Sequence, residues 1–358
     1  MNVKHDRVNN FDAIRLLGAT LVLVGHAFPM HGDSAGNPVI WGETIQVAGV
    51  ILFFALSGYL IATSWKLDPR FLPYMQKRSL RIFPALIVVT LASMFVLGPV
   101  LSRLSVGDYL ANPNLWLYLK NIILSPVYAL PGVFENAPIP NAVNGSLWSL
   151  PVEFACYLLV PLFALLPARF RAAAFLSFGL VVGVTSELLL ENAVRIVVYG
   201  TDIAQATSVW PYFMVGAALA YAPKILALRL DVALALLIGG SLLTSTLPVL
   251  ATPVWWLVLP YAAIALGTAR TPLLSRVGRF GDVSYGLYLY AFPVQQSIIA
   301  LLPGLSFSAS VLLTLLISSV LAFASWHLVE KRALTLKPAR KPTRPASEPA
   351  ATSAGGSA

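Results

Sequence analysis

Long apolar runs separated by short polar connections account for most of this chain. Ten of them approach or reach the roughly 20 residues that a helix needs to cross about 30 Å of hydrocarbon. They cover residues 11–31, 43–65, 81–101, 146–167, 172–190, 207–222, 231–248, 251–268, 282–302 and 307–328. Because backbone N–H and C=O groups cannot stay unpaired in lipid, each run is expected to be a helix. The pattern predicts an all-α polytopic membrane helix bundle with about ten transmembrane helices.

Composition excludes a set of soluble domains. Of the 358 residues, 58% are hydrophobic and 11% are charged, and the mean hydropathy is +0.77. An ordinary globular chain has about 45–50% apolar and about 25% charged residues. The single cysteine, Cys156, excludes an internal disulfide framework and a Cys-rich metal site. It lies in an apolar segment, where we expect it to pack as a small hydrophobic side chain.

The net charge of +9 could indicate nucleic-acid binding, but the positions of the charges indicate a membrane topology. When the ten spans are threaded with the N-terminus inside, all but three of the 24 Lys and Arg residues fall on one side. The exceptions are Arg103, Lys120 and Arg195. An excess of basic residues marks the cytoplasmic side, so both termini are predicted to be cytoplasmic. Adding or dropping one span would destroy this separation.

Two segments are not expected to span the membrane. Residues 102–145 form the longest predicted external loop, with Asn136, Asn141 and Asn144 as candidates for sugar contacts. Its aromatic residues, which could stack on a sugar or anchor the loop at the interface, are Tyr109, Trp116, Tyr118, Tyr128 and Phe134. Residues 331–358 form a basic tail that cannot bury apolar surface, so we expect disorder there. The predicted division is a membrane domain at 1–330 and a cytoplasmic tail at 331–358.

Arg15 and His26 lie inside the first predicted span, where ionisable residues are costly and mark function by default. Eleven positions at 100° each bring both side chains to one face of the helix, about 16 Å apart along its axis. Arg15 lies near the inner end and His26 nearer the outer end. The alternative is that Arg15 extends to the inner interface and His26 bonds a neighbouring carbonyl.

Glu153 is the third ionisable residue expected within a span, about 10 Å from the outer end of its helix. A buried carboxylate without a partner would bind a proton, so a nearby His or Arg is the expected partner. Its position on the same side of the midplane as His26 would allow it to orient that ring if the two helices meet. An ion pair that only holds the helix bundle together is the alternative.

A basic cluster, Lys77, Arg78 and Arg81, lies at the inner end of the third predicted span. Arg side chains match the geometry of phosphate, so the cluster could bind a cytosolic phosphorylated ligand or could simply follow the positive-inside pattern. In the second span, Ser57 and Gly58 would allow a ligand or another helix to approach the backbone closely.

Five motifs in this order resemble the acyltransferase-3 family of integral-membrane carbohydrate O-acyltransferases. They are Phe11-Asp12-Ala13-Ile14-Arg15 with ten residues and then His26, the segment 53–61, the segment 78–84, Ser146 to Glu153, and the segment 284–293; Val329-Glu330-Lys331 also fits. The resemblance implies an O-acyltransferase in a bacterial inner membrane. It also implies an acyl-CoA donor, usually acetyl-CoA, taken from the cytoplasm, and a carbohydrate acceptor at the outer side of the membrane.

The resemblance also implies roles for individual residues. Arg15 and His26 match the proposed catalytic pair, Glu153 matches the motif glutamate, and Arg81 matches the motif linked to donor binding. We expect Arg15, Arg78, Arg81, Ser57 and Gly58 to contact the donor. Many relatives carry a second His where this chain has Ala291, which leaves His26 as the candidate base or covalent acyl carrier.

The expected acyl transfer requires no metal, and no nucleic-acid partner is expected. A secondary transporter or flippase for a sugar-linked molecule is the alternative function, since ten spans with a polar interior would also suit it. The sequence leaves open the acceptor sugar, the length of the donor's acyl chain and the oligomeric state.

Overall fold

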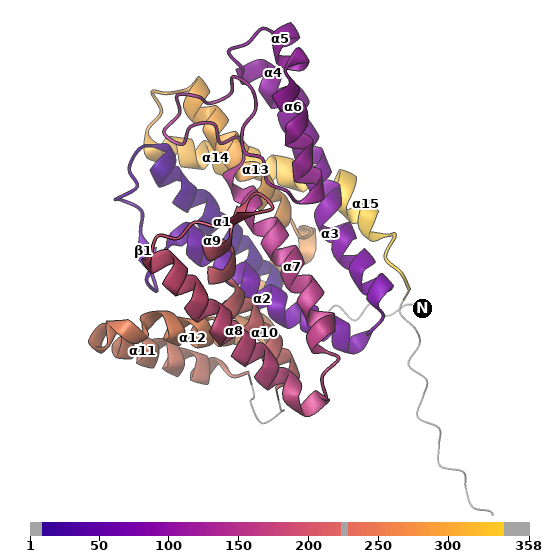
Figure 1. Ribbon diagram of the computed structural model, residues 1–358, viewed down its shortest axis with the longest axis vertical. Helices are drawn as coiled ribbons and strands as arrows, with labels where there is room; N and C mark the ends of the chain where they lie inside the picture. Colours follow the sequence, from indigo (N-terminus) through magenta and orange to yellow (C-terminus); the bar gives the residue numbers. More distant parts are fainter. Residues whose placement is uncertain (1–8, 223–227, 340–358) are drawn as a thin grey trace, which may run out of the picture.

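A computed structural model describes residues 9–222 and 228–339 of the chain (Figure 1). Its regular structure is almost entirely helical; two antiparallel hairpins of two-residue strands occur at Val39–Ile40 with Glu43–Thr44 (β1, β2) and Val197–Val198 with Thr201–Asp202 (β3, β4). The α-helices are α1 Phe11–Met30, α2 Ile45–Leu67, α3 Phe71–Ala92, α4 Gly98–Leu101, α5 Val106–Ala111, α6 Pro113–Leu117, α7 Ser149–Phe163, α8 Ala168–Glu191, α9 Ile203–Ser208, α10 Trp210–Tyr221, α11 Leu230–Thr246, α12 Ala251–Thr268, α13 Ser284–Leu301, α14 Phe307–Ser325 and α15 Lys331–Leu334. Short 3-10 or π segments are η1 Ser93–Leu97, η2 Tyr118–Ile123, η3 Gly145–Trp148, η4 Pro248–Leu250, η5 Leu274–Phe280 and η6 Trp326–Glu330.

Seven helical stretches of the described residues are long and apolar enough to cross a membrane. They are Phe11–Met30, Ile45–Leu67, Phe71–Leu101, Gly145–Phe163, Ala168–Glu191, Pro248–Thr268 and Phe307–Leu334. The predicted all-α membrane bundle is confirmed. The other three predicted spans coincide with α10, α11 and α13, but α10 has only 12 residues, α11 has 17, and α13 carries several Tyr and Gln residues. The count of ten spans therefore stays a prediction.

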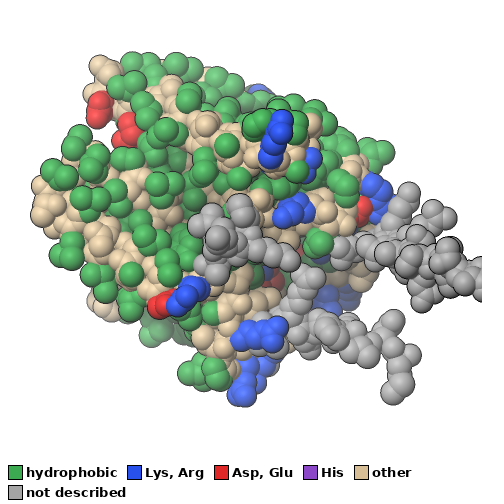
Figure 2. Space-filling view, turned by 90° about the horizontal axis from the view of Figure 1, so that it is seen from below, with side chains coloured by type: hydrophobic (Ala, Val, Ile, Leu, Met, Phe, Trp, Pro, Cys, Tyr) green, Lys and Arg blue, Asp and Glu red, His purple; other side chains and the backbone are tan. Residues whose placement is uncertain are grey.

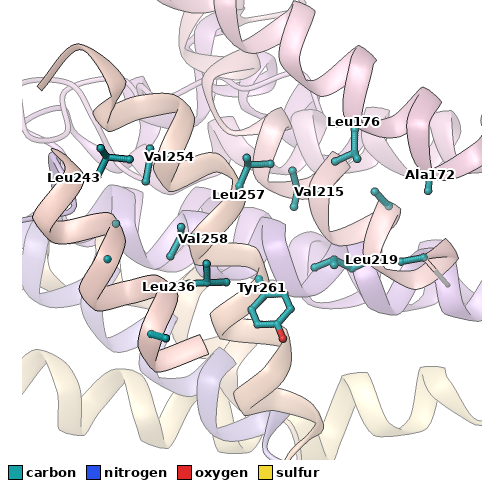
Figure 3. A pocket seen from close by; sticks show the side chains of 15 residues that line it. Ala172, Leu176, Val215, Leu219, Leu236, Leu243, Val254, Leu257, Val258 and Tyr261 are labelled. Carbon is teal, nitrogen blue, oxygen red and sulfur yellow. The ribbon is translucent and has the colours of Figure 1, made fainter. Parts of the chain in front are cut away.

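The surface of the bundle is apolar over its outer helices. Leu180 on α8, Leu234 on α11 and Val320 on α14 are each more than half exposed. An apolar groove of about 590 Å³ lies between α8, α10, α11 and α12 (Figure 3). Such surface is stable when hydrocarbon covers it, which fits helices that face lipid.

Helix α2 forms the centre of the bundle and packs against α1, α7, α10 and α12. Gly58 on α2 faces the backbone of α10 so closely that a Cβ there would overlap the carbonyl oxygen of Phe213, and Gly216 on α10 faces Ala55 in the same way. Small residues permit this approach between membrane helices. Helix packing therefore explains the glycine at position 58, and its expected contact with a donor stays a prediction.

Basic residues are unequally divided between the two ends of the molecule. The three cations predicted to be external, Arg103, Lys120 and Arg195, lie at one end. The segment around Arg195 contacts the loop that carries the other two, because the Tyr199 hydroxyl donates a hydrogen bond to the Ile123 carbonyl at 2.7 Å. At the opposite end, Lys66 and Arg171 lie over the ring of Tyr221 at 5.2 and 5.7 Å. Figure 2 shows that end, with several Lys and Arg side chains and few carboxylates. For these described residues, the separation expected from the sequence is present in the fold; which end faces the cytoplasm stays a prediction.

The predicted external loop is more ordered than a simple connection. Tyr109 and Tyr118 are fully buried with Met94 and Leu115 in a small core of its own, and the Tyr109 hydroxyl donates to the Met94 carbonyl at 2.8 Å. These two aromatic rings are structural and cannot stack on a sugar at the surface. Trp116 remains 51% exposed.

The predicted tail begins as structured chain. Helix α15 covers its first four residues, the Arg70 guanidinium donates to the Ala339 carbonyl at 3.1 Å, and the Gln76 amide donates to the Leu336 carbonyl at 3.2 Å. Residues 331–339 therefore lie along α3. The expectation of disorder for residues 340–358 lies outside the described residues.

Candidate active site

The first helix presents its polar stripe to the segment around α13. Arg15 contacts Asp282, two residues before α13, with Nη2 3.3 Å from Oδ2. Eleven residues further along α1, the half-buried ring of His26 meets the edge of Phe292 on α13, with ring centroids 5.1 Å apart. Arg15 and His26 thus face the same neighbouring segment, as the helical spacing predicts, at two different depths of the bundle.

At the inner depth, Asp282 joins two arginines from different helices. Its Oδ2 lies 2.6 Å from Arg81 Nη2 on α3, and its Oδ1 accepts a hydrogen bond from Ser284 at 2.5 Å. Arg81 reaches further, with Nη1 3.2 Å from Glu330 Oε2 in η6. Arg15 also pairs with Asp12 on its own helix. Three carboxylates therefore neutralise two guanidinium groups, and this ion-pair network fastens α1, α3, α13 and η6 together.

At the middle depth, Glu153 on α7 is held by hydroxyl groups. Its Oε1 accepts hydrogen bonds from Ser57 on α2 and from Tyr157 on its own helix, both at 2.6 Å. The structure brings together Glu153 and Ser57, two candidates that were expected to have different roles. It does not place His26 or an arginine against the carboxylate, because the hydroxyl groups occupy that position.

One face of α13 connects these depths. Tyr285 lies under the Arg81 guanidinium, 5.3 Å from its ring centroid, and donates to the Ile82 carbonyl at 2.9 Å. One turn on, the Tyr288 hydroxyl lies 2.6 Å from Ser149 Oγ. Both tyrosines line a small cavity with Glu153 and Ser149. With Phe292 one further turn along, α13 carries a row of aromatic residues from the ion-pair network to His26.

At the outer end of the site, a proline in α13 determines which neighbouring segment binds the helix. Pro293 has no N–H, so the carbonyl of Leu289, four residues earlier, lacks its helical donor. The Asn144 amide donates to that carbonyl at 2.9 Å instead. This bond brings Gly145 against the ring of Phe292, where a Cβ would overlap the ring. The end of the 102–145 segment is thereby held beside His26.

Both nitrogens of the His26 ring lack a hydrogen-bond partner among the residues that the structure describes. A neutral imidazole with a free nitrogen can accept a proton from a hydroxyl group or attack a carbonyl carbon. The ring is therefore available for chemistry.

The chain matches the family model described as "Acyltransferase domain" over residues 8–329. It is also 32% identical over 342 residues to an O-acetyl transferase of Shigella phage Sf6, an alignment that covers 91% of this chain and 96% of that protein. The chain belongs to the acyltransferase-3 family. With its membrane-spanning helices, it is a membrane O-acyltransferase.

Two further relatives match over shorter stretches. Nodulation protein 10 of Rhizobium leguminosarum is 32% identical over 178 residues, 47% of each chain. The peptidoglycan O-acetyltransferase OatA of Listeria monocytogenes is 30% identical over 149 residues, 38% of this chain and 22% of that protein. No solved structure matches the acyltransferase.

The basic cluster of the acyltransferase separates into residues with and without a carboxylate partner. Lys77 and Arg70 both bind Asp68, with their nitrogens 2.8 and 2.6 Å from its oxygens, and these hydrogen bonds hold the pKa of Asp68 well below its usual range. Arg81 is paired as described above. Within the described residues Arg78 has no carboxylate partner; its guanidinium lies 5.9 Å from the Tyr74 ring centroid and its Nε is buried without a hydrogen bond.

Several residues that contact the predicted site residues were not themselves predicted from the sequence. Asp282, Tyr285 and Tyr288 were not selected, although all three lie in or beside the 284–293 motif. Tyr157 could have been found, because residues four apart on a helix are neighbours and Tyr157 follows Glu153 at that spacing. Asp282 carried a weaker signal, a lone carboxylate among basic residues at the inner end of a predicted span. Within residues 9–222 and 228–339, no group of three or more His, Cys, Asp and Glu side chains could hold a metal ion.

Proposed function

We propose that the acyltransferase moves an acetyl group from cytosolic acetyl-CoA to a hydroxyl group of a sugar at the outer side of the membrane. The observation that carries this proposal is the row of α13 side chains that leads from the basic end of the bundle to an unpartnered His26. A CoA thioester is long, with its phosphates at one end and its acyl group at the other. Such a donor suits a site whose basic residues and catalytic base lie at different depths.

The phosphate contact of the donor is assigned first to Arg78. Arg15 and Arg81 are already neutralised by three carboxylates, whereas Arg78 has none among the described residues. Burial and the charges of Arg78, Arg81 and Lys77 lower the pKa of Lys337, which indicates a positive potential at this place. Arg15 and Arg81 add further positive charge near the donor's phosphates, which compete with the three carboxylates for these two guanidinium groups. Ser57 then positions Glu153 beside the path of the acyl group.

His26 acts on the reacting atoms. The acceptor oxygen attacks the thioester carbonyl carbon, a C–O bond forms, the C–S bond breaks, and the hydroxyl proton passes through His26 to the sulfur of the departing CoA. In the covalent route, His26 first takes the acetyl group and then gives it to the same oxygen, with the same overall balance. Glu153 is a positioning residue, since it holds Ser57 and Tyr157 beside the row of α13 tyrosines.

The test is transfer by the purified full-length protein in liposomes. We expect ¹⁴C-acetate from labelled acetyl-CoA to appear as base-labile ester on glycans of the native host membrane, with release of an equal amount of CoA thiol. Binding or movement of the glycans without any consumption of acetyl-CoA would contradict the proposal and favour a transporter.

Donor binding gives a separate prediction. Replacing Arg78 by Gln removes the cation without a carboxylate partner, so KM for acetyl-CoA should rise by about tenfold with a much smaller change in kcat, the effect of one lost charge-assisted contact. Initial rates at varied acetyl-CoA concentration measure this. Arg332→Gln is the matched control, since Arg332 is an exposed arginine on α15. Equal KM values for the Arg78 variant and the control would remove Arg78 from the donor site.

A further inference from the structure

Two hollows of different polarity meet at the outer half of α13. The first is a cleft of about 530 Å³ between residues 132–138 and the end of α13. Arg103, Glu135, Asn136 and Gln296 give it polar walls. With the Asn136 amide oriented so that its oxygen faces Arg103, that oxygen accepts hydrogen bonds from the guanidinium at 2.8 and 3.0 Å.

The second hollow is an apolar groove of about 500 Å³ between α3–α4, α13 and α14. Ala92, Val96, Ser297 and Leu321 are among its walls. It opens on the lipid-facing surface, where Val96 is 65% exposed. Val100, Leu101 and Leu301 line both hollows, so the polar cleft and the apolar groove lie directly beside each other.

The polar cleft contains a hydrogen-bond acceptor that the protein leaves unused. The Gln296 amide nitrogen donates to the carbonyls of Ile139 and Ala142 at 2.9 and 3.2 Å, whereas its Oε1 is buried without a partner. The neighbouring Gln295 is fully buried, and neither end of its amide has a partner. Buried polar atoms are normally paired, so Gln296 Oε1 is a candidate acceptor for a donor that the chain itself does not supply.

The cleft also approaches the catalytic base. Ile299, one of its lining residues, packs beside Met30, Ala142 and Phe292. Phe292 lies one turn before Gln296 and contacts the His26 ring. The cleft is therefore connected to His26 through two packed side chains, Ile299 and Phe292.

We propose that the acceptor is a glycan carried on a hydrocarbon anchor, with the sugar in the polar cleft and the anchor in the apolar groove. This inference rests on the proposed function and names the class of its acceptor. A free, water-soluble glycan would use the cleft alone and leave the groove to bulk lipid. Two adjacent hollows, one polar and one apolar, fit one molecule with a polar and an apolar part. Its sugar hydroxyl receives the acetyl group by the ester-forming step given above.

The first test compares two forms of the same acceptor. Glycolipids extracted from the native host membrane are used intact or after mild acid has removed the hydrocarbon anchor, each with ¹⁴C-acetyl-CoA and wild-type protein in liposomes. We expect kcat/KM to be at least about tenfold higher for the intact glycolipid, because burial of only a few CH₂ groups supplies this factor. Equal kcat/KM for both forms would overturn the inference. Absence of transfer to either form would instead overturn the proposed function.

Substitutions in the two hollows give a second test with different signatures. Ser297→Phe and Ala92→Phe fill the groove from opposite walls and should lower kcat/KM about tenfold for the intact glycolipid but leave the anchor-free glycan unaffected. Glu135→Ala, in the polar cleft, should lower kcat/KM for both forms. The control Gly239→Phe fills the other apolar groove, between α8, α10, α11 and α12, where a Cβ meets nothing within 4 Å (Figure 3). Equal effects of the three groove substitutions on the intact glycolipid would contradict the inference.

Discussion

Asp282 is the residue that ties the inner end of the site together. It contacts Arg15 from α1 and Arg81 from α3, and it receives a hydrogen bond from Ser284. Its side chain is only 15% exposed, so water replaces little of this attraction. Removal of one member of a buried ion pair leaves its partners uncompensated, which costs more than the pair itself contributes.

Asp282→Asn should therefore destabilise the protein by on the order of 3 kcal/mol, because both guanidinium groups lose their shared carboxylate. Thermal unfolding of purified protein in detergent measures this. Glu191→Gln, at the exposed end of α8, serves as the control and should leave the unfolding temperature unchanged. If the two variants unfold at the same temperature, the ion-pair network does not stabilise the bundle.

Helical spacing alone predicts some residue contacts of the site and fails to predict others. The common face of Arg15 and His26 follows from 3.6 residues per turn, and the structure places both against the α13 segment. The partner of Glu153 was predicted as His or Arg, whereas Ser57 and Tyr157 bind it. Glu153 is only partly buried. The neighbour that binds its carboxylate depends on packing between helices, and the spacing of residues along one helix does not specify that packing.

At the scale of helices, prolines free backbone carbonyls that accept hydrogen bonds from side chains of other segments. Pro29 in α1 frees the carbonyl of Gly25, to which Asn37 donates at 3.2 Å. Pro161 in α7 frees the carbonyl of Tyr157, to which the Tyr74 hydroxyl donates at 2.8 Å. Pro293 and Asn144 form the third case. In each, a side chain satisfies a backbone group that lipid could not.

If Asn144 compensates for the N–H that Pro293 lacks, the effects of substitutions at these two positions on stability should be coupled. Asn144→Ala leaves the Leu289 carbonyl unpaired and should destabilise the protein by about 1–2 kcal/mol. Adding Pro293→Ala restores the helical N–H, so the double variant should regain part of that loss. Unfolding temperatures of the two single variants and the double variant form the cycle. Strictly additive effects would show that Asn144 does not compensate for the proline.

Prolines were visible in the sequence, but their consequences were not. The 284–293 motif ends at Pro293, and the helix was expected to run on to 302, which α13 does to Leu301. That a distant Asn supplies the missing hydrogen bond requires knowing which loop returns to that helix. The third predicted span was placed at 81–101, although the helix begins at Phe71, because a helix can continue through charged residues beyond the hydrocarbon.

At the scale of the whole molecule, the division of charge is the strongest feature that the sequence provided. The two ends of the fold separate Arg103, Lys120 and Arg195 from the basic residues around Tyr221 and α3. Within residues 9–222 and 228–339, seven helical stretches meet the length and hydropathy of a span. The helices α10, α11 and α13 lie at predicted spans but are too short or too polar to be recognised by those properties alone.

Cysteine labelling tests this topology directly, since the only native cysteine, Cys156, is fully buried. A membrane-impermeant maleimide added to intact spheroplasts should label Lys120→Cys and Gly304→Cys, which flank the predicted outer ends. Arg169→Cys, in the first turn of α8 at the predicted inner end, should be labelled only after permeabilisation. Labelling of position 304 from the inside would show that α13 does not cross the membrane and that fewer than ten spans are present.

The central claim is that the free ring of His26, at the end of the α13 row, performs the acyl transfer. Acetyl transfer from ¹⁴C-acetyl-CoA by His26→Ala and His31→Ala protein, at equal amounts in liposomes, tests it most directly. His31 is a matched control, since it follows α1 and its ring contacts Phe307. We expect His26→Ala to lose about 100-fold or more of the rate, as loss of a general base does, and His31→Ala to keep it. A His26→Ala protein that transfers acetyl at the wild-type rate would contradict the account.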